Sequence, residues 1–375
     1  MIDNLLSDGY EFMRKIKPWL QNLLLMLAGV IVGLLIIETF AITTGVAAPQ
    51  KSKAQIFYQF IQPDAELGYK PKSNLRGFKT VWKEARVTEV ANTDSYGFRN
   101  VGRVYTKSNL YFVGDSFTWG QWVSEEKTFP RIIESELKQP VINLGVPGYS
   151  FAQYETLFNE WIAKYKPSTV ILSIVANDLT NYSADIGQKI YDTLKQRSFS
   201  PWYEKTFLYQ LLLKNNKKIL KKQIVNHISK EAINGLTLFN LSLVAPESGV
   251  GVDSDYLTSD AVVKVEAALS RIINLAKENQ VKLFVFLVPS KESAYVKDYA
   301  QLFPLDVALL KNEEIGYQRL CDIVTSQEVT CVNLTDDFRK NSDREKLYFD
   351  IDGHWNPAGH QLATKVILNT LKNNL

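Results

Sequence analysis

The hydrophobic pattern near the start of the chain predicts a helix that spans a membrane. The stretch from Leu23 to Ile37 contains no polar side chain, and the run stays mostly apolar as far as Ala48. A spanning helix needs about 20 predominantly apolar residues, so we expect one over residues 20–45. Three basic residues lie just before this run: Arg14, Lys15 and Lys17. By the positive-inside rule, residues 1–19 are expected to be cytoplasmic and the rest of the chain exported.

Two other structures are compatible with such a run, namely a cleaved signal peptide and a buried helix of a soluble domain. The run is longer than the apolar part of an ordinary signal peptide. Pro49 directly follows Ala48, and a proline there suits cleavage poorly. The pattern therefore favours an uncleaved anchor.

From residue 109 onward, short apolar runs alternate with amphipathic stretches. Five runs predict buried strands: residues 109–113, 141–144, 169–175, 282–288 and 329–334. Between and after them, four stretches predict helices: residues 128–137, 151–165, 306–325 and 357–371. Strands alternating with helices are typical of a parallel α/β sheet. The continuous hydrophobicity of residues 169–175 fits a strand covered on both faces.

Two segments lie outside this alternation. Residues 46–108 are expected to form a linker with accessory strands, because residues 80–92 partly alternate and residues 94–99 look like a turn. Within the α/β domain over residues 109–375, the alternation is interrupted at about 180–280. Two or three helical stretches are expected there, near residues 185–196, 202–229 and 257–279, and we interpret them as an insertion or lid-like cap.

Composition narrows the classes of function. The net charge of +3 is small and argues against nucleic-acid binding. Two cysteines are too few for a four-cysteine zinc site. Cys321 and Cys331 lie at a helix end and in the next strand, where either a disulfide or two buried thiols would fit. Histidine chemistry has three candidates: His227, His354 and His360.

Three polar or glycine positions follow the first three predicted strands. Ser116 comes directly after the first strand, behind Gly114. Gly148 lies in the turn after the second strand, and Asn177 follows the third. The carboxyl ends of parallel strands meet at one edge of the sheet, where open α/β folds bind ligands. A serine nucleophile there could use the glycine N–H and the asparagine amide to stabilise an oxyanion.

A histidine with nearby carboxylates precedes the last predicted helix. His354 could take the proton of a serine hydroxyl, and a carboxylate would hold its ring in the correct tautomer. Asp352 is the nearer candidate for that carboxylate, and Asp350 is the alternative. If the segment is extended, both aspartates share a side with His354, so alternation alone does not choose between them. His360 falls inside the helix and is expected to be further from the site.

Taken together, these residues resemble the SGNH, or GDSL-like, hydrolase and acyltransferase superfamily over roughly residues 105–373. The match assigns the nucleophile to Ser116, the oxyanion hole to the Ser116 N–H, Gly148 and Asn177, and the remaining triad positions to Asp352 and His354. The resemblance implies a flavodoxin-like three-layer α/β/α fold and a Ser-His-Asp mechanism without a metal or cofactor.

Two positions depart from the usual pattern of this superfamily. Val175 stands where the third block normally has glycine, and Ile351 stands where the last block normally has the aspartate. Asp352 and His354 instead resemble the Asp-x-His variant of polysaccharide O-acetyltransferase relatives. The stretch Val288–Glu292, after the fourth strand, is similar to the same relatives.

The resemblance and the predicted anchor together imply a membrane-bound serine esterase that acts on O-acyl, above all acetyl, esters of cell-envelope glycans. Two alternatives stay open. The chain could transfer an acyl group to an exported polysaccharide, receiving it from a membrane acyltransferase partner. It could also be an inactive glycan-binding module, although the intact Ser116, Asp352 and His354 argue against this.

Overall fold

A computed structural model of the chain describes residues 18–44, 59–82, 87–107, 109–179, 230–239 and 260–374, together with residues 182, 190 and 192. The chain divides into two compact units. One comprises residues 1–52 with 199–223, and the other comprises residues 53–198 with 224–375. The helix expected near 202–229 lies outside the described residues, as does the one near 185–196 apart from residues 190 and 192.

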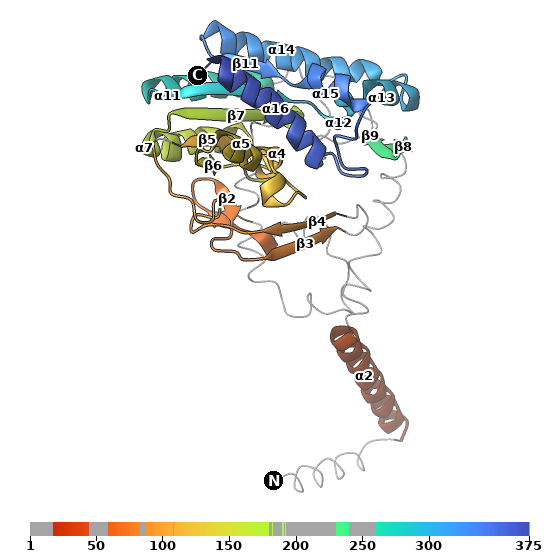
Figure 1. The fold of residues 1–375 in the computed structure, drawn as a ribbon. Helices are drawn as coiled ribbons and strands as arrows, with labels where there is room; N and C mark the ends of the chain where they lie inside the picture. Colours follow the sequence, from red (N-terminus) through yellow and green to blue (C-terminus); the bar gives the residue numbers. More distant parts are fainter. Residues whose placement is uncertain are drawn as a thin grey trace. The chain divides into compact units, whose positions relative to one another are not determined.

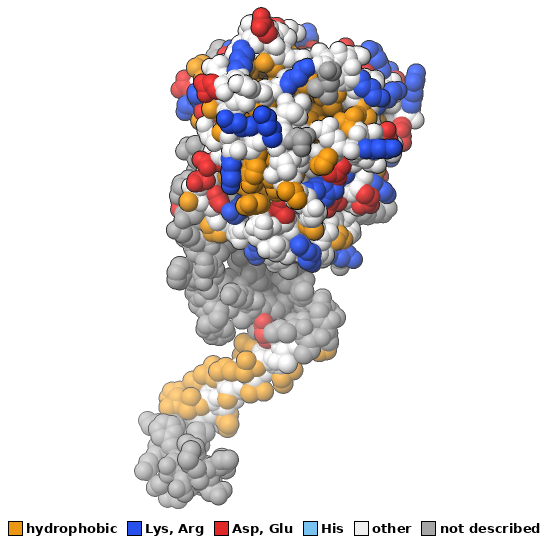
Figure 2. Space-filling view, turned by 60° about the vertical axis from the view of Figure 1, so that its left-hand side comes forward, with side chains coloured by type: hydrophobic (Ala, Val, Ile, Leu, Met, Phe, Trp, Pro, Cys, Tyr) orange, Lys and Arg blue, Asp and Glu red, His pale blue; other side chains and the backbone are white. Residues whose placement is uncertain are grey.

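In the first unit, the described residues form one long apolar helix, α2 (Pro18–Thr44). Within its segment Pro18–Phe40, an 18-residue window reaches a mean hydropathy of 2.6. Hydrophobic side chains cover the face of this helix seen in Figure 2. The helix expected over residues 20–45 is therefore present and is long and apolar enough to cross a membrane.

The second unit is built on a parallel five-stranded sheet (Figure 1). In chain order its strands are β5 (Leu110–Val113), β6 (Val141–Asn143), β7 (Thr169–Val175), β10 (Lys282–Val288) and β11 (Thr330–Asn333). Their spatial order is β11-β10-β7-β5-β6, which is the flavodoxin-like arrangement. The strand order reverses between β5 and β7, and a ligand crevice is expected at their carboxyl ends.

Each strand contributes side chains to both faces of the sheet, as the twofold alternation of a strand requires. In β7, Val170, Leu172 and Ile174 belong to one hydrophobic core. The intervening Ile171 and Val175 belong to the other. Two packed cores explain why this strand is buried along its whole length and mostly apolar, instead of alternating between apolar and exposed polar residues.

Helices cover both cores. On one face lie α6 (Phe151–Leu157), α11 (Asp260–Glu278) and α14 (Leu310–Ser326). On the other lie α5 (Phe129–Leu137), α15 (Thr335–Ser342) and α16 (Pro357–Asn374). The three-layer α/β/α fold is thus confirmed.

Helix α11 corrects the interpretation of residues 257–279 as part of a helical cap. Its apolar side chains recur at helical spacing, and Val265, Leu269 and Ile272 are fully buried in the core beside α6 and α14. The helix is therefore a layer of the fold that leads into β10. In the sequence, it follows a long segment without strand signals and so looked like the end of the insertion.

The described part of the accessory segment, residues 59–82 and 87–107, belongs to the second unit. It forms two antiparallel hairpins, β1 (Ile61–Asp64) with β2 (Gly68–Pro71) and β3 (Phe78–Trp82) with β4 (Val87–Ala91). Tyr69 is buried in the same core as the sheet. The expected turn at residues 94–99 is present. The Asp94 carboxylate accepts the main-chain N–H groups of Tyr96, Gly97 and Phe98.

Cys321 and Cys331 form a disulfide between α14 and β11, with their Cα atoms 5.4 Å apart. Of the two arrangements that the sequence allowed, the structure has the disulfide. A disulfide is stable in the oxidising compartments outside the cytoplasm.

Candidate active site

Ser116 lies at the carboxyl end of β5, as the first residue of the short helix α4 (Ser116–Trp119). The preceding Asp115 caps this helix by accepting the Phe117 N–H at 2.9 Å. A side chain at Gly114 would overlap Thr118, because a Cβ there would come within 2.1 Å of its Oγ1. Glycine at this position therefore makes room for the Thr118 side chain, which packs against the main chain just before Ser116.

His354 lies directly beside Ser116. Its Nε2 is 2.7 Å from Ser116 Oγ, although the two residues are 238 positions apart in the chain. On the other side of the ring, Nδ1 is bonded to Asp352 Oδ1. The side chain of Asp352 is only 1% exposed, whereas that of His354 is 17% exposed. A buried carboxylate thus meets a ring that is partly open to solvent.

Asp350, the alternative partner of His354, is directed elsewhere. Its carboxylate pairs with Lys346 at 3.0 Å and is 62% exposed. The chain bends from residue 350 through His354 instead of running extended, so the expected alternation of side chains does not hold there. Of the two aspartates, only Asp352 contacts the ring.

His360, another of the three histidines, lies away from this site. His360 is buried in α16, where its Nδ1 accepts the Phe129 N–H at 3.3 Å. Burial lowers the pKa of His360 to about 3, so its ring is neutral at ordinary pH. His227 lies outside the described residues.

Gly148 lies in the turn after β6 with a φ of +82°, a conformation that favours glycine. A Cβ at this position would come within 2.7 Å of Tyr69 Oη. The Tyr69 hydroxyl donates to the Pro147 carbonyl at 2.9 Å, and the Tyr149 hydroxyl donates to the Tyr69 carbonyl at 2.8 Å. The accessory hairpin β1–β2 is therefore joined by two hydrogen bonds to the turn that carries Gly148.

Asn177 is in the short turn of helix η3 (Ala176–Leu179), directly after β7. Its neighbour Asp178 is buried, and the Asp178 carboxylate accepts the Val175 N–H at 3.1 Å and the Tyr154 hydroxyl at 3.0 Å. Burial raises the pKa of Asp178 well above its ordinary value. Val175, which replaces the usual glycine, packs in the core and leaves Asn177 at the sheet edge.

Two buried residues of the accessory segment support the turn after Ser116, and sequence reasoning did not identify either. Arg99 donates to the carbonyls of Trp119 and Gly120 at 2.9 and 3.1 Å. Glu89 accepts the indole N–H of Trp119 at 2.6 Å. Arg99 lies in the stretch recognised as a turn, but nothing in the local pattern indicated its partners, which are about twenty residues further on.

A small apolar cluster packs beside the loop that carries His354. Trp122, from the turn after α4, is 4% exposed and contacts Phe349 and Ile351. Ile351 occupies the position where the superfamily normally has the triad aspartate, and here it fills this cluster.

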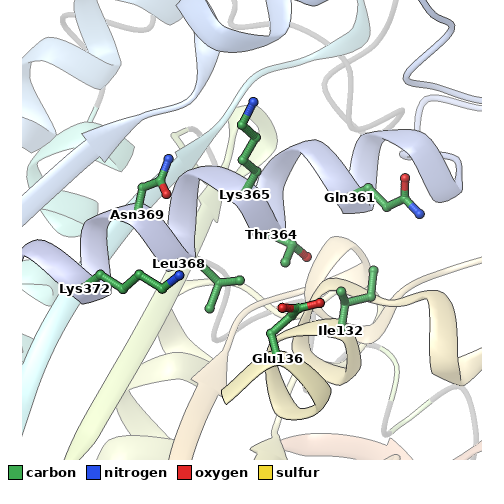
Figure 3. Close-up of a pocket in the computed structure, with 8 residues that line it drawn as sticks. All are labelled: Ile132, Glu136, Gln361, Thr364, Lys365, Leu368, Asn369 and Lys372. Atoms are coloured by element: carbon green, nitrogen blue, oxygen red, sulfur yellow. The ribbon is translucent and has the colours of Figure 1, made fainter. Parts of the chain in front are cut away.

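Two surface hollows lie away from these residues. One, of about 390 Å³, runs between α5 and α16 and is lined by residues such as Glu136, Lys365 and Lys372 (Figure 3). The other, of about 740 Å³, is lined by residues that include Arg103, Glu134 and Lys138. Neither is lined by Ser116, Asp352 or His354.

A serine hydroxyl, an imidazole and a carboxylate bonded in this order form the arrangement that activates serine in hydrolases of several unrelated folds. A flavodoxin-like sheet with this group at its carboxyl edge is the SGNH class of protein. A family model for GDSL-like lipases and acylhydrolases matches residues 112–362. The chain therefore belongs to this family and is an ester hydrolase of the SGNH type.

The chain is also similar in structure to several solved proteins of low sequence identity. An acetyl xylan esterase has 14% sequence identity and a TM-score of 0.39, and the match covers 70% of this chain and 98% of the esterase chain. A GDSL-like lipase from Bacteroides thetaiotaomicron has 14% sequence identity and a TM-score of 0.40, and the match covers 74% of this chain and 95% of the lipase chain. A catalytic mutant of an acetylxylan esterase from Geobacillus stearothermophilus has 12% sequence identity and a TM-score of 0.39, and the match covers 71% of this chain and 94% of the mutant chain. No curated protein matches the sequence significantly.

Proposed function

We propose that the chain is a membrane-anchored serine esterase that removes O-acyl groups, above all acetyl groups, from cell-envelope glycans. The observation that carries the chemistry is the 2.7 Å contact between Ser116 Oγ and His354 Nε2, with Asp352 bonded to the opposite ring nitrogen. The glycan substrate rests on the expected position of the domain outside the cytoplasm.

In the proposed reaction, Ser116 Oγ attacks the ester carbonyl while His354 Nε2 takes its proton. The negative charge of the tetrahedral intermediate is stabilised by the N–H groups of Ser116 and Gly148 and the side-chain amide of Asn177, and one such donor is worth about 3 kcal/mol. The protonated His354 then gives its proton to the departing alcohol, leaving an acyl-enzyme. A water molecule, activated by His354, releases the acyl group as a carboxylic acid.

The buried Asp352 suits the role of orienting His354. A carboxylate kept away from bulk water makes a strong charge-assisted bond to the ring. It stabilises the imidazolium that forms in each step and does not itself need to accept the proton.

The test is an ester screen on the full chain in a mild detergent, with p-nitrophenyl acetate, longer p-nitrophenyl esters and acetylated oligosaccharides. Ser116→Ala should lower acetate release by about a thousandfold or more and leave the circular dichroism spectrum unchanged. Ser124→Ala is the matched control, because Ser124 lies in a nearby turn and donates to Glu126. Activity that survives in Ser116→Ala would contradict the proposal.

The same assay separates hydrolysis from transfer. Isotope-labelled acetyl donor is mixed with an unacetylated oligosaccharide, and the products are analysed by mass spectrometry. We expect free acetate as the main product. Labelled acetyl-oligosaccharide as the main product would favour the transferase, and no turnover together with no labelling of Ser116 by a fluorophosphonate would favour a binding module.

The proposed topology has a test of its own. Reporter fusions at the C-terminus and protease treatment of intact cells should place residues beyond 48 outside the cytoplasm, with the chain retained in the membrane after a carbonate wash. An active cytoplasmic reporter would reverse the orientation, and release of the chain by carbonate would exclude the anchor.

A further inference from the structure

Lys291 is a buried lysine that the proposed reaction does not use. It begins the short helix α12 (Lys291–Ala294), directly after β10, and is 1% exposed. It belongs to the stretch Val288–Glu292, which stood out in the sequence. A lysine is almost never fully buried unless its ammonium group has partners.

The partners are main-chain carbonyls of the loop that carries Asp352 and His354. Lys291 Nζ donates to the carbonyl oxygens of Phe349 at 2.7 Å, Asp350 at 3.0 Å and Asp352 at 3.5 Å. An ammonium group has three hydrogens, one for each of these acceptors. A neutral amine has only two, so it cannot satisfy all three carbonyls.

A second element holds the same loop from another direction. This element is the hairpin of β8 (Lys230–Ile233) with β9 (Leu236–Phe239), which lies within the insertion. The Thr237 N–H of this hairpin donates at 2.7 Å to the Asp350 carbonyl, which Lys291 also contacts. The Phe349 N–H meanwhile donates to the His354 carbonyl at 3.1 Å. The loop is thus closed on itself and tied to its surroundings through its carbonyl groups.

The short helix α12, which carries Lys291, is itself held in place by hydrogen bonds. Ser290 caps α12 and donates through its hydroxyl to Glu313 of α14 at 2.6 Å. Arg339 of α15 donates to the Ser293 carbonyl at 2.8 Å. The ammonium group therefore extends toward the loop from a helix that is hydrogen-bonded to α14 and α15.

We propose that Lys291 is a positioning residue, whose ammonium group holds the loop carbonyls so that Asp352 keeps the His354 ring aligned with Ser116. This inference rests on the proposed esterase function. A displacement of about 1 Å in a reacting group can cost about a hundredfold in rate, so a loosened loop should slow the chemical step. Substrate binding should change little, because Lys291 is buried beneath the loop.

The inference includes a pH dependence. Burial lowers the pKa of Lys291 to about 8, and the nearby charges act as smaller influences. Charged and titratable groups around Lys291 and its helix are Glu292, Glu313, Arg339, Lys346, Asp350 and Asp352. As the pH rises through about 8, Lys291 loses its proton and one of its three hydrogen bonds, and turnover should decline.

The experiment measures kcat and KM of the full chain in mild detergent, with p-nitrophenyl acetate, from about pH 6 to about pH 10. The rate with Ser116→Ala is subtracted to remove spontaneous hydrolysis. Lys291→Met is the test variant, and Lys297→Met is the control because Lys297 is 77% exposed on its side chain and pairs with Asp343. We expect Lys291→Met to lower kcat by about a hundredfold, to change KM less than about threefold, and to abolish the decline near pH 8.

Several outcomes would overturn the inference. A Lys291→Met variant with unchanged kcat and an unchanged pH profile would do so. If that variant does not fold, the wild-type profile decides, because kcat that does not decline between about pH 7.5 and 9 contradicts the role of the ammonium group. Fluorophosphonate labelling separates this result from failure of the esterase proposal: no labelling of wild-type Ser116 contradicts the esterase, whereas equal labelling rates in wild type and Lys291→Met contradict only the role of Lys291.

Discussion

One carboxylate oxygen of Asp352, Oδ1, bonds both the ring Nδ1 and the main-chain N–H of His354, the latter at 2.9 Å. The bend at Gly353 makes this double contact possible over two residues. With the hydrogen on Nδ1 directed at Asp352, Nε2 is left to accept the hydrogen of Ser116 Oγ. The contact therefore selects the tautomer that a general base needs.

Replacing this carboxylate should be far more costly than replacing Asp350. Asp352→Asn presents an amide to Nδ1 and can favour the wrong tautomer, so we expect turnover to fall by at least about a hundredfold. Asp350→Asn removes only an exposed pair with Lys346 and should lower turnover less than about tenfold. Steady-state kinetics on both variants check this, and the opposite ranking would give the orienting role to Asp350.

Gly148→Ala should lower kcat by about tenfold or more. The new Cβ would meet Tyr69 Oη at 2.7 Å, and the φ of +82° is unfavourable for alanine. Removing the hydroxyl with Tyr69→Phe relieves the contact but not the backbone strain. We therefore expect the double variant to recover part of the lost activity, relative to Tyr69→Phe alone, and no recovery would mean that the Tyr69 contact is unimportant.

Glu313 should make the stability of the fold depend on pH. It is buried, and burial raises its pKa from an ordinary 4.5 to about 7. Protonated Glu313 therefore stabilises the folded state, with a contribution that is complete below about pH 4.5 and disappears as the pH rises to about 7. In denaturant titrations of the full chain, wild type should lose stability relative to Glu313→Gln across this interval and no further above it.

The neighbouring Glu314 provides the control for that measurement. It is 47% exposed on its side chain and pairs with Arg339, so Glu314→Gln shows what the loss of an exposed carboxylate at the adjacent position does by itself. A wild-type curve parallel to that of Glu313→Gln at all pH values would show that Glu313 has the same pKa in the folded and unfolded states.

Removing the disulfide should destabilise the fold without affecting the chemistry. Cys321 and Cys331 close a short loop, with a sequence separation of 10, and a loop of this size is worth about 3 kcal/mol. The double variant Cys321→Ala/Cys331→Ala should show a loss of this order in the free energy of unfolding and near wild-type kcat at moderate temperature. Mass spectrometry of non-reduced peptides should find the two cysteines linked, and free thiols in the exported protein would contradict the prediction.

Local patterns in the sequence were sufficient for the elements that occupy the centre of the fold. The apolar run of β7 and the helical stripe from Phe151 to Tyr165 each carry their own periodicity, because burial on two faces or on one stripe constrains neighbouring residues directly. The structure interrupts that stripe with a π-helical turn at Phe158–Ile162. The short hairpin β8–β9 escaped notice, because a strand of four residues is too short to show a period.

The sequence by itself determined the apolar helix, the parallel sheet and the positions of Ser116, Gly148, Asn177 and His354 at its edge, because strand ends and turn residues are local features of the chain. Only the tertiary structure decided between Asp350 and Asp352, since the bend of their loop depends on contacts with Lys291 and Thr237, which are remote in the chain. The same holds for Tyr69, Glu89 and Arg99, which support the site from the accessory segment. These contacts join residues that are far apart in the chain, so they produce no periodic pattern in the sequence. They form only when folding brings the residues together and buries them.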